Sequence, residues 1–417
     1  MIGVEEALAR VLAEAKPLPA ERTALVAAAG RALAEPLVAS ADLPPFDDSS
    51  MDGWAVRAAD LAAATPGAEV TLPVAFKVHA GERAPRALAP GECARVFTGA
   101  PLPDGADAVV KQEIVTAGEA GARFARPARA GEHVRRRGSD VAAGDTALAA
   151  GAALGPGELA LLAAQGCPYV TVHRRPRVAL LATGDELRDL GEPPERGHIV
   201  ASSTYALAAA VRAAGGEPML LGIARDDRAD ARARIHAGLG CDVLLTTGGV
   251  SVGDHDLVKD ALRESGCQER FWKVAIKPGK PIFFGVGPSS GGPPPGALVF
   301  GLPGNPISTM VCFEVFVRPA LRALAGHGVL HRPVLEARLE RSVHKEAGRR
   351  EYLRASARVA GGRLHVRPLD QQSSGALSSM VGVNAFVVFP EDAVALHEGD
   401  LVRAMLIDAP LPADPAA

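Results

Sequence analysis

Apolar runs alternate with amphipathic segments along the chain between residues 176 and 325. The apolar runs predict buried strands at 177–183, 218–224, 241–247, 270–276, 281–287 and 297–304. The segments 203–216, 229–240, 255–266 and 306–326 have the spacing of apolar residues that predicts helices. Fully apolar strands that alternate with helices are typical of a mostly parallel, doubly wound α/β sheet.

Shorter runs of alternating polar and apolar residues flank this central region. Four of them lie between residues 70 and 140, separated by glycine and proline clusters, and predict a small antiparallel β-barrel or sandwich. Further runs after residue 328 predict a C-terminal β-barrel of about 80 residues. Segments 3–15 and 156–166 predict helices within extended connections.

We therefore expect a multidomain α/β and β protein with four parts. The expected parts are an elongated connecting and dimerisation domain (1–44 and 141–174), a small β domain (45–140), a doubly wound domain (175–327) and a C-terminal β-barrel (328–417).

Composition narrows the class of function. The 417 residues include 45 Lys and Arg against 48 Asp and Glu, a net charge of −3, without the basic excess of a nucleic-acid-binding protein. No run of about 18 apolar residues predicts a membrane span, and the acidic first helix lacks the features of a signal peptide. The five cysteines are scattered without a CxxC pair, as in reduced proteins. We expect a cytoplasmic protein with no nucleic-acid or membrane partner.

Acidic residues follow two of the predicted strands. Asp185 and Glu186 come after the first strand, and Asp226 and Asp227 come after the second. In a doubly wound sheet these positions share the edge where ligands bind. Converging carboxylates repel one another unless they are protonated or bind a hard cation. Although an acid can simply cap a helix, the set of four predicts a magnesium site.

Glycines and lysines on the same edge predict an anion site. Gly248, Gly249 and Ser251 connect strand 241–247 to the next helix, where backbone N–H groups favour an oxyanion. Three lysines follow in FWKVAIKPGKP (Lys273, Lys277 and Lys280). A plain strand-to-helix turn also explains the glycines, and Asn305 and Pro306 also read as an N-cap and first helical residue.

Taken together, the motifs resemble one family, the molybdopterin molybdenumtransferases, which includes MoeA and the E domain of gephyrin. The runs SSMDGWAVR, FTGAPLPDGADAVVKQE, RRRGSD, LATGDEL, ARDD, TTGGVSVGD, FWKVAIKPGKP and GLPGNP occur in the family's order and span nearly the whole chain. Each of three motifs also has a simpler interpretation: SSMDGW as an ordinary turn, FTGAP as a hairpin turn and RRRGSD as a solvated run of charges. Trp54 stands where the family commonly has tyrosine.

The resemblance implies insertion of molybdate into adenylylated molybdopterin, with release of AMP, at a magnesium-dependent site of a homodimer. It also implies transient contact with other molybdenum-cofactor biosynthesis proteins. The catalytic residues it implies are Asp52, Asp140, Glu186, Asp226, Asp256, Lys273 and Lys277, with Glu186 and Asp226 as metal ligands. With the strand-end motifs, it gives as substrate-binding residues Thr98, Gly248, Gly249, Ser251, Lys280, Pro303, Asn305, Pro306 and Ser373.

Two other functions are compatible with parts of the chain. A molybdopterin adenylyltransferase shares the doubly wound domain and the GGVS-type loop, but that function leaves residues 1–170 and 330–417 unexplained. A scaffold protein on the same fold is the second alternative. It has no need of the acidic residues, so the intact set favours an enzyme.

Overall fold

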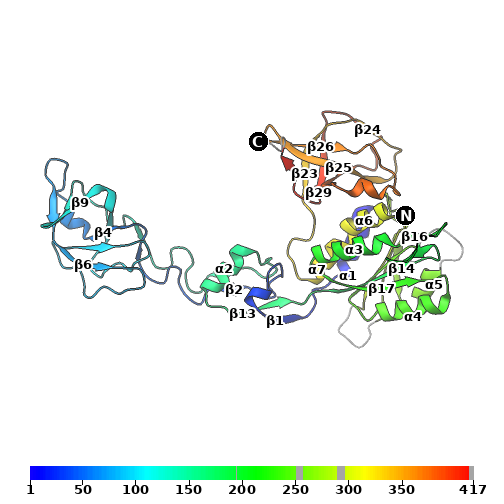
Figure 1. Ribbon diagram of the computed structural model, residues 1–417, viewed down its shortest axis with the longest axis horizontal. Helices are drawn as coiled ribbons and strands as arrows, with labels where there is room; N and C mark the ends of the chain where they lie inside the picture. Colours follow the sequence, from blue (N-terminus) through cyan, green and yellow to red (C-terminus); the bar gives the residue numbers. More distant parts are fainter. Residues whose placement is uncertain (194, 250–256, 289–295, 413–417) are drawn as a thin grey trace. The chain divides into compact units, whose positions relative to one another are not determined.

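The computed structural model describes residues 1–193, 195–249, 257–288 and 296–412 (Figure 1). It divides into two compact units. The first contains Met1–Glu35, Ala150–Leu159 and Pro168–Ala417, and the second contains Pro36–Ala149 and Ala160–Cys167. The division into four domains stays a prediction. Along the described residues, no helix combines the length and the apolar character needed to cross a membrane.

A six-stranded sheet forms the centre of the first unit. Its strand order is β17 (Glu217–Ala224), β14 (Arg177–Thr183), β18 (Val243–Thr247), β22 (Leu298–Leu302), β21 (Phe283–Val286) and β19 (Gln268–Trp272). The first four strands are parallel, β21 runs antiparallel to its two neighbours β22 and β19, and β19 at the edge therefore points the same way as the first four. The prediction of a mostly parallel, doubly wound sheet is confirmed.

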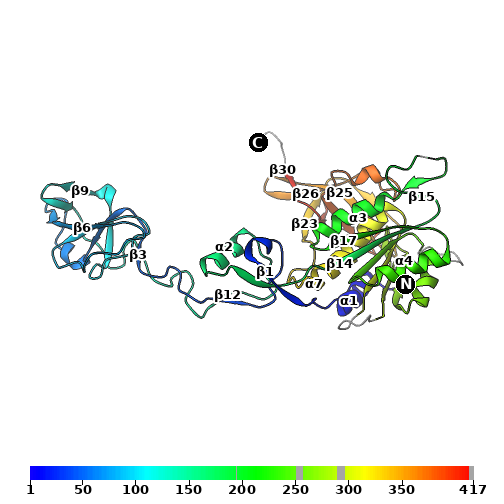
Figure 2. The ribbon, with the colours of Figure 1, turned by 60° about the horizontal axis from the view of Figure 1, so that its bottom comes forward.

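Helices cover both faces of this sheet (Figures 1 and 2). One face packs on α4 (Arg228–Gly238) and α5 (Leu257–Glu264), and the other on α1 (Val4–Glu14), α3 (Ser202–Ala213), α6 (Pro306–Cys312) and α7 (Arg318–Leu324). Strand β14 supplies both cores: Val178 and Leu180 join the second set of helices, whereas Ala179 and Leu181 join α4 and α5. Successive side chains of a strand point to opposite faces, which explains its continuous apolar run.

The predicted helix 306–326 is interrupted by a π-helical turn at Phe313–Val317, between α6 and α7. Pro319 lies at the start of α7. Because proline has no N–H, it cannot donate to the carbonyl one turn earlier, and a wider turn is one way to accommodate that loss. All five residues of the turn are buried, so packing holds the irregular segment in place.

The predicted strand 270–276 ends early, at Trp272. Lys273 has φ +80°, and the chain leaves the sheet there. The next strand, β20 (Ile276–Lys277), pairs in parallel with β25 (Arg350–Ala360) of the C-terminal sheet. An apolar sequence pattern cannot show such a change of sheet, because Phe271 before it and Ile276 after it are both buried.

Five C-terminal strands close into a barrel. They are β23 (Val334–Leu339), β25, β26 (Arg363–Pro368), β27 (Ala385–Phe389) and β29 (Leu401–Leu406). The ring runs β25–β26–β23–β29–β27 and closes where β27 pairs with β25. Alternate residues of these strands, such as Ala355, Ala357, Val387 and Phe389, fill the interior. The predicted C-terminal barrel is therefore confirmed.

The second unit contains two small sheets. One has the order β6 (Val74–Val78), β7 (Cys93–Val96), β4 (Gly53–Val56) and β8 (Ala108–Lys111), and the other β5 (Val70–Leu72), β10 (Gly121–Phe124) and β9 (Val115–Gly118). We predicted antiparallel strands, but β6 pairs with β7 in parallel. The residues between β6 and β7 include turns rather than a tight hairpin, and a long connection permits either direction.

Smaller elements complete the description. The connecting segments contain β1 (Ala20–Ala24), which pairs with β13 (Tyr169–His173), β2 (Leu37–Val38), which pairs with β12 (Thr146–Leu148), β3 (Asp48–Ser49), which pairs with β11 (Val134–Arg135), and α2 (Pro156–Ala164). The remaining short strands are β15 (Leu187–Arg188), β16 (Ile199–Val200), β24 (Val343–His344), β28 (Ala395–Leu396) and β30 (Leu411–Pro412).

Candidate active site at the strand ends

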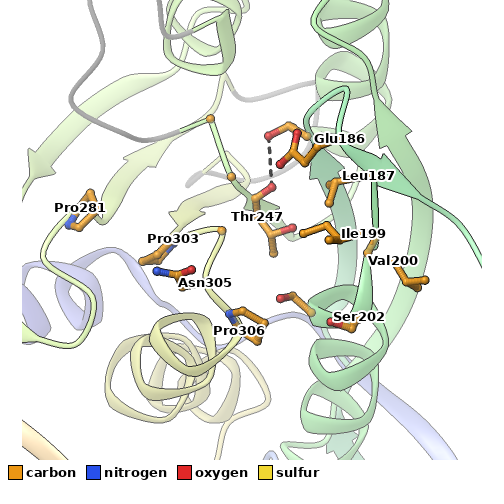
Figure 3. Close-up of a pocket in the computed structure, with 16 residues that line it drawn as sticks. Glu186, Leu187, Ile199, Val200, Ser202, Thr247, Pro281, Pro303, Asn305 and Pro306 are labelled. Atoms are coloured by element: carbon orange, nitrogen blue, oxygen red, sulfur yellow. Dashed lines mark hydrogen bonds between the residues drawn. The ribbon is translucent and has the colours of Figure 1, made fainter. Parts of the chain in front are cut away.

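A pocket of about 430 Å³ lies at the carboxyl ends of β14, β18 and β22 (Figure 3). Its lining combines three of the four predicted strand-end motifs, all except Asp226 and Asp227, with the starts of α3 and α6. The lining residues are Thr183, Glu186, Leu187, Ile199, Val200, Ala201, Ser202, Ser203, Thr247, Gly248, Gly249, Pro281, Pro303, Gly304, Asn305 and Pro306. The structure thus brings together Glu186, Gly248, Gly249, Pro303, Asn305 and Pro306 of the predicted site.

Close backbone packing explains the two glycines after β18. The Thr183 hydroxyl donates to the Thr247 carbonyl oxygen at 3.2 Å, and the Gly248 N–H donates to the Leu302 oxygen at 3.1 Å. Gly248 has φ +87°, and a Cβ there would lie 2.7 Å from the Thr183 oxygen. At Gly249, with φ +63°, a Cβ would lie 2.3 Å from Val258 Cγ2. Only glycine therefore allows the three strand ends to approach so closely.

The four acids at the ends of β14 and β17 divide into two kinds, and of the four only Glu186 lines the pocket. Asp185 accepts the Asp226 N–H at 3.0 Å, and Asp227 caps α4 by accepting the Asp230 N–H at 2.7 Å. The carboxylates of Asp185 and Asp227 therefore accept backbone N–H groups of neighbouring segments. Within the described residues, no hydrogen bond or ion pair occupies the carboxylates of Glu186 and Asp226. The helix-cap alternative therefore applies to Asp227 and not to the two predicted metal ligands.

The donor set suits a cation that takes only part of its ligands from protein. The described part of the chain contains no group of three or more His, Cys, Asp or Glu residues placed to hold a metal. Magnesium commonly binds through one or two carboxylates together with substrate phosphates and water. Two uncommitted carboxylates on neighbouring strand ends, Glu186 and Asp226, fit that mode.

The three predicted lysines lie in different surroundings. Lys277 is half-exposed, and its Nζ lies 3.1 Å from Oε1 of Glu351, whose side chain is only 8% exposed. The Lys273 Nζ lies 4.6 Å from the ring centroid of Trp272. Lys280 is exposed, and its carbonyl oxygen accepts the Val274 N–H at 3.2 Å. None of the three lines the pocket, although Pro281, next to Lys280, does.

Asn305 and Pro306 occupy the predicted positions at the start of α6, but the side chain of Asn305 makes no cap. Its Nδ2 donates instead to Ser374 Oγ of the C-terminal part at 3.1 Å. Pro303 is fixed by its carbonyl oxygen, which accepts the Thr309 hydroxyl at 2.5 Å. The predicted substrate residue Ser373 neighbours the serine that makes the contact.

Arg354 is a candidate that sequence reasoning missed. It is only 1% exposed, and its Nη2 donates to the carbonyl oxygens of Gln371 (2.8 Å) and Ser373 (3.2 Å). Burial lowers the pKa of its guanidinium, and its Nε has no partner in the described residues. A buried cation therefore shapes the loop that reaches Asn305. In the sequence it is one arginine of an alternating strand, so only its unusual burial reveals it.

In the second unit, Asp52 and Thr98 meet. Asp52 Oδ1 accepts the Thr98 N–H at 2.8 Å and the Thr98 hydroxyl at 2.9 Å. These hydrogen bonds lower the pKa of Asp52, so the carboxylate is ionised at neutral pH. Asp140 is the last residue of RRRGSD, and its N–H donates to the Leu43 oxygen at 3.0 Å. Ser251 and Asp256 lie outside the described residues.

Comparison with known proteins gives one family along the chain. Residues 2–166 match the model "MoeA N-terminal region (domain I and II)", residues 179–323 match "Probable molybdopterin binding domain", and residues 336–407 match "MoeA C-terminal region (domain IV)". Each match covers a region that contains predicted site residues.

Relatives that match over most of the chain belong to the same family. A molybdopterin molybdenumtransferase of Nostoc is 38% identical over 369 residues, which cover 88% of this chain and 84% of that protein. Molybdopterin molybdenumtransferase 2 of Mycobacterium tuberculosis is 39% identical over 90% of this chain and 92% of its own length. The crystal structure of a molybdopterin biosynthesis MoeA protein from Pyrococcus horikoshii superposes with a TM-score of 0.84 at 31% identity, covering 97% of this chain and 100% of that one. This chain therefore belongs to the molybdopterin molybdenumtransferase (MoeA) family.

Proposed function

We propose that this chain inserts molybdenum from molybdate into adenylylated molybdopterin and releases AMP, as a molybdopterin molybdenumtransferase. The observation that carries the proposal is the pocket itself. It joins the backbone of Gly248 and Gly249, the helix start at Asn305 and the Glu186 carboxylate, which has no partner among the described residues, at one sheet edge. An anionic substrate with a bound cation suits that combination.

The residues would act by position and charge. Gly248, whose N–H is bonded to Leu302, would shape the turn, Gly249 would present its N–H to an oxyanion, and the start of α6 favours negative charge. Lys273 and Lys280 add positive charge to the segment beside Pro281 and would attract molybdate and the substrate phosphate, whereas Glu351 offsets part of the Lys277 charge. Such a site promotes cleavage of a phosphoanhydride by orientation and charge stabilisation, without a protein nucleophile.

Glu186 and Asp226 would hold a magnesium ion. Bound there, Mg²⁺ would neutralise negative charge on the phosphoanhydride of adenylylated molybdopterin. Asp52, Asp140, Asp256, Thr98, Ser251 and Ser373 remain proposed functional residues through the family resemblance. We also propose that the protein is a cytoplasmic homodimer that contacts other molybdenum-cofactor biosynthesis proteins transiently; light scattering of the purified protein tests the dimer.

The test is a reaction of the purified protein with adenylylated molybdopterin, molybdate and Mg²⁺. We expect molybdate-dependent AMP release and a product that activates a molybdenum-free apoenzyme. Glu186→Gln and Asp226→Asn should lose this activity while their melting temperatures stay close to that of the wild type.

Three outcomes would overturn the proposal. Pyrophosphate release from ATP and free molybdopterin would indicate an adenylyltransferase. No turnover by a folded wild-type protein would favour a scaffold. Wild-type activity in both carboxylate variants would remove the metal assignment.

A further inference from the structure

We infer that Trp272 is a positioning residue for molybdate use, because it holds the Lys273 ammonium group against its ring. This inference rests on the proposed function. The Lys273 Nζ lies 4.6 Å from the ring centroid, within the range of a cation–π contact. The ring's own place is fixed, since Trp272 is the last residue of β19 and packs against the core between the sheet and α4 and α5.

The backbone at Lys273 supports a functional reason for this contact. Its φ of +80° is uncommon for a residue other than glycine, and such a conformation persists only where the surrounding structure enforces it. The enforcing contacts are present: the Lys273 N–H donates to the Ile282 oxygen at 3.2 Å, and the Lys273 oxygen accepts the Ile2 N–H at 3.4 Å. Glycine would occupy this conformation without strain, yet a lysine stands there.

A second cation lies on the same ring. The Lys259 Nζ of α5 is 3.6 Å from the ring centroid of Trp272 and 3.7 Å from Oε2 of Glu269. Two ammonium groups on one ring repel each other, and the Glu269 carboxylate beside Lys259 relieves part of that repulsion. The ring thus keeps positive charge at the end of β19, one backbone hydrogen bond from Ile282, the neighbour of the pocket-lining Pro281.

Two single variants and one double variant test the role of the ring. Trp272→Leu keeps apolar volume and removes the π face, whereas Trp272→Phe keeps a weaker π face. We expect Trp272→Leu to raise the half-saturating molybdate concentration by about two- to fivefold, and Trp272→Phe to restore part of the loss. Introduced into Lys273→Ala, Trp272→Leu should have no further effect on the molybdate requirement.

Thermal melts separate positioning from packing. Removing the indole costs packing in either background, so the melting temperature should fall by similar amounts with Lys273 or Ala at position 273. A molybdate requirement that is unchanged in Trp272→Leu, or that rises equally in the Lys273→Ala background, would overturn the inference. Failure of the wild type to use molybdate at all would instead refute the proposed function.

Fluorescence gives a readout independent of turnover. The chain contains two tryptophans, Trp54 and Trp272, so Trp54→Phe leaves Trp272 as the single indole. Titration with molybdate alone should change its emission if the anion acts on the lysine beside the ring, and Lys273→Ala should abolish that change. Emission that responds equally with and without Lys273 would contradict the inference.

Discussion

Replacing Gly184 by alanine displaces the Glu186 carboxylate without changing its chemistry. Gly184 has φ +139°, and a Cβ there would lie 2.2 Å from Glu186 Oε2 and 2.7 Å from Cδ. Ordinary van der Waals contact begins at 3.4 Å, so the carboxylate must retreat by about 1 Å or more. The obstacle is the end of a flexible side chain, which can swing away.

The size of the expected effect follows from that displacement. A misplacement of about 1 Å can cost about a hundredfold in rate, and Mg²⁺ demands near-ideal ligand positions at about 2.0–2.1 Å. We expect Gly184→Ala to lower kcat/KM about a hundredfold at limiting Mg²⁺ and to raise the Mg²⁺ requirement. Its stability should fall only by the cost of the strained backbone, about 1–3 kcal/mol.

Gly191→Ala is a matched control. Gly191 also has positive φ (+84°), but a Cβ there would meet nothing within 4 Å. The control should lose stability through backbone strain and keep its Mg²⁺ titration curve. The assay is AMP release against Mg²⁺ concentration, beside urea unfolding of both variants. A wild-type Mg²⁺ curve for Gly184→Ala would refute the reasoning, because it would mean that the position of Glu186 has no bearing on the metal.

Two further predictions concern buried charge. Lys277→Ala leaves the Glu351 carboxylate, 8% exposed, without its cation, and should cost about 1–3 kcal/mol of stability; adding Glu351→Gln should recover part of it, and equal melting temperatures of Lys277→Ala and wild type would contradict this. Burial lowers the pKa of His327 from 6.5 to about 4, so the unfolded chain binds more protons between these values and stability should decline as pH falls from 6.5 toward 4. In His327→Gln, the free energy of unfolding measured with urea should fall less between pH 6.5 and 4. The same pH dependence in wild type and variant would mean that His327 does not cause the decline.

The sequence predicts the central fold because each strand is a continuous apolar run and each helix has its own period. The end of each apolar run marks the end of a strand. Glu186, Gly248 and Asn305 could therefore be predicted at one edge of the sheet from the sequence alone. Where the prediction fails, the cause is non-local. The strand through Lys273 changes sheets because Ile276 pairs with Arg350, a partner that no local pattern identifies.

The same reason explains what was missed at the site. In the sequence, Lys277 has the surroundings expected of an exposed lysine that binds an anion. Only the structure reveals its pairing with buried Glu351. Arg354 resembles any arginine of a barrel strand until its exposure of 1% is known. The sequence predicts a helix cap from the side chain of Asn305, but that side chain contacts Ser374 instead. Each of these contacts joins residues far apart in the sequence.

At the candidate site, positive φ values are accommodated in two different ways. Gly184, two residues before Glu186, and the predicted site residues Gly248 and Lys273 all have positive φ. The two glycines avoid strain where a Cβ would collide with its neighbours, whereas Lys273 retains strain that glycine would remove. A cost of about 1–3 kcal/mol is tolerated only where the rest of the fold offsets it. The buried sheet and its two helical layers supply that excess stability. Lys273 can therefore occupy a position whose backbone conformation alone would favour glycine.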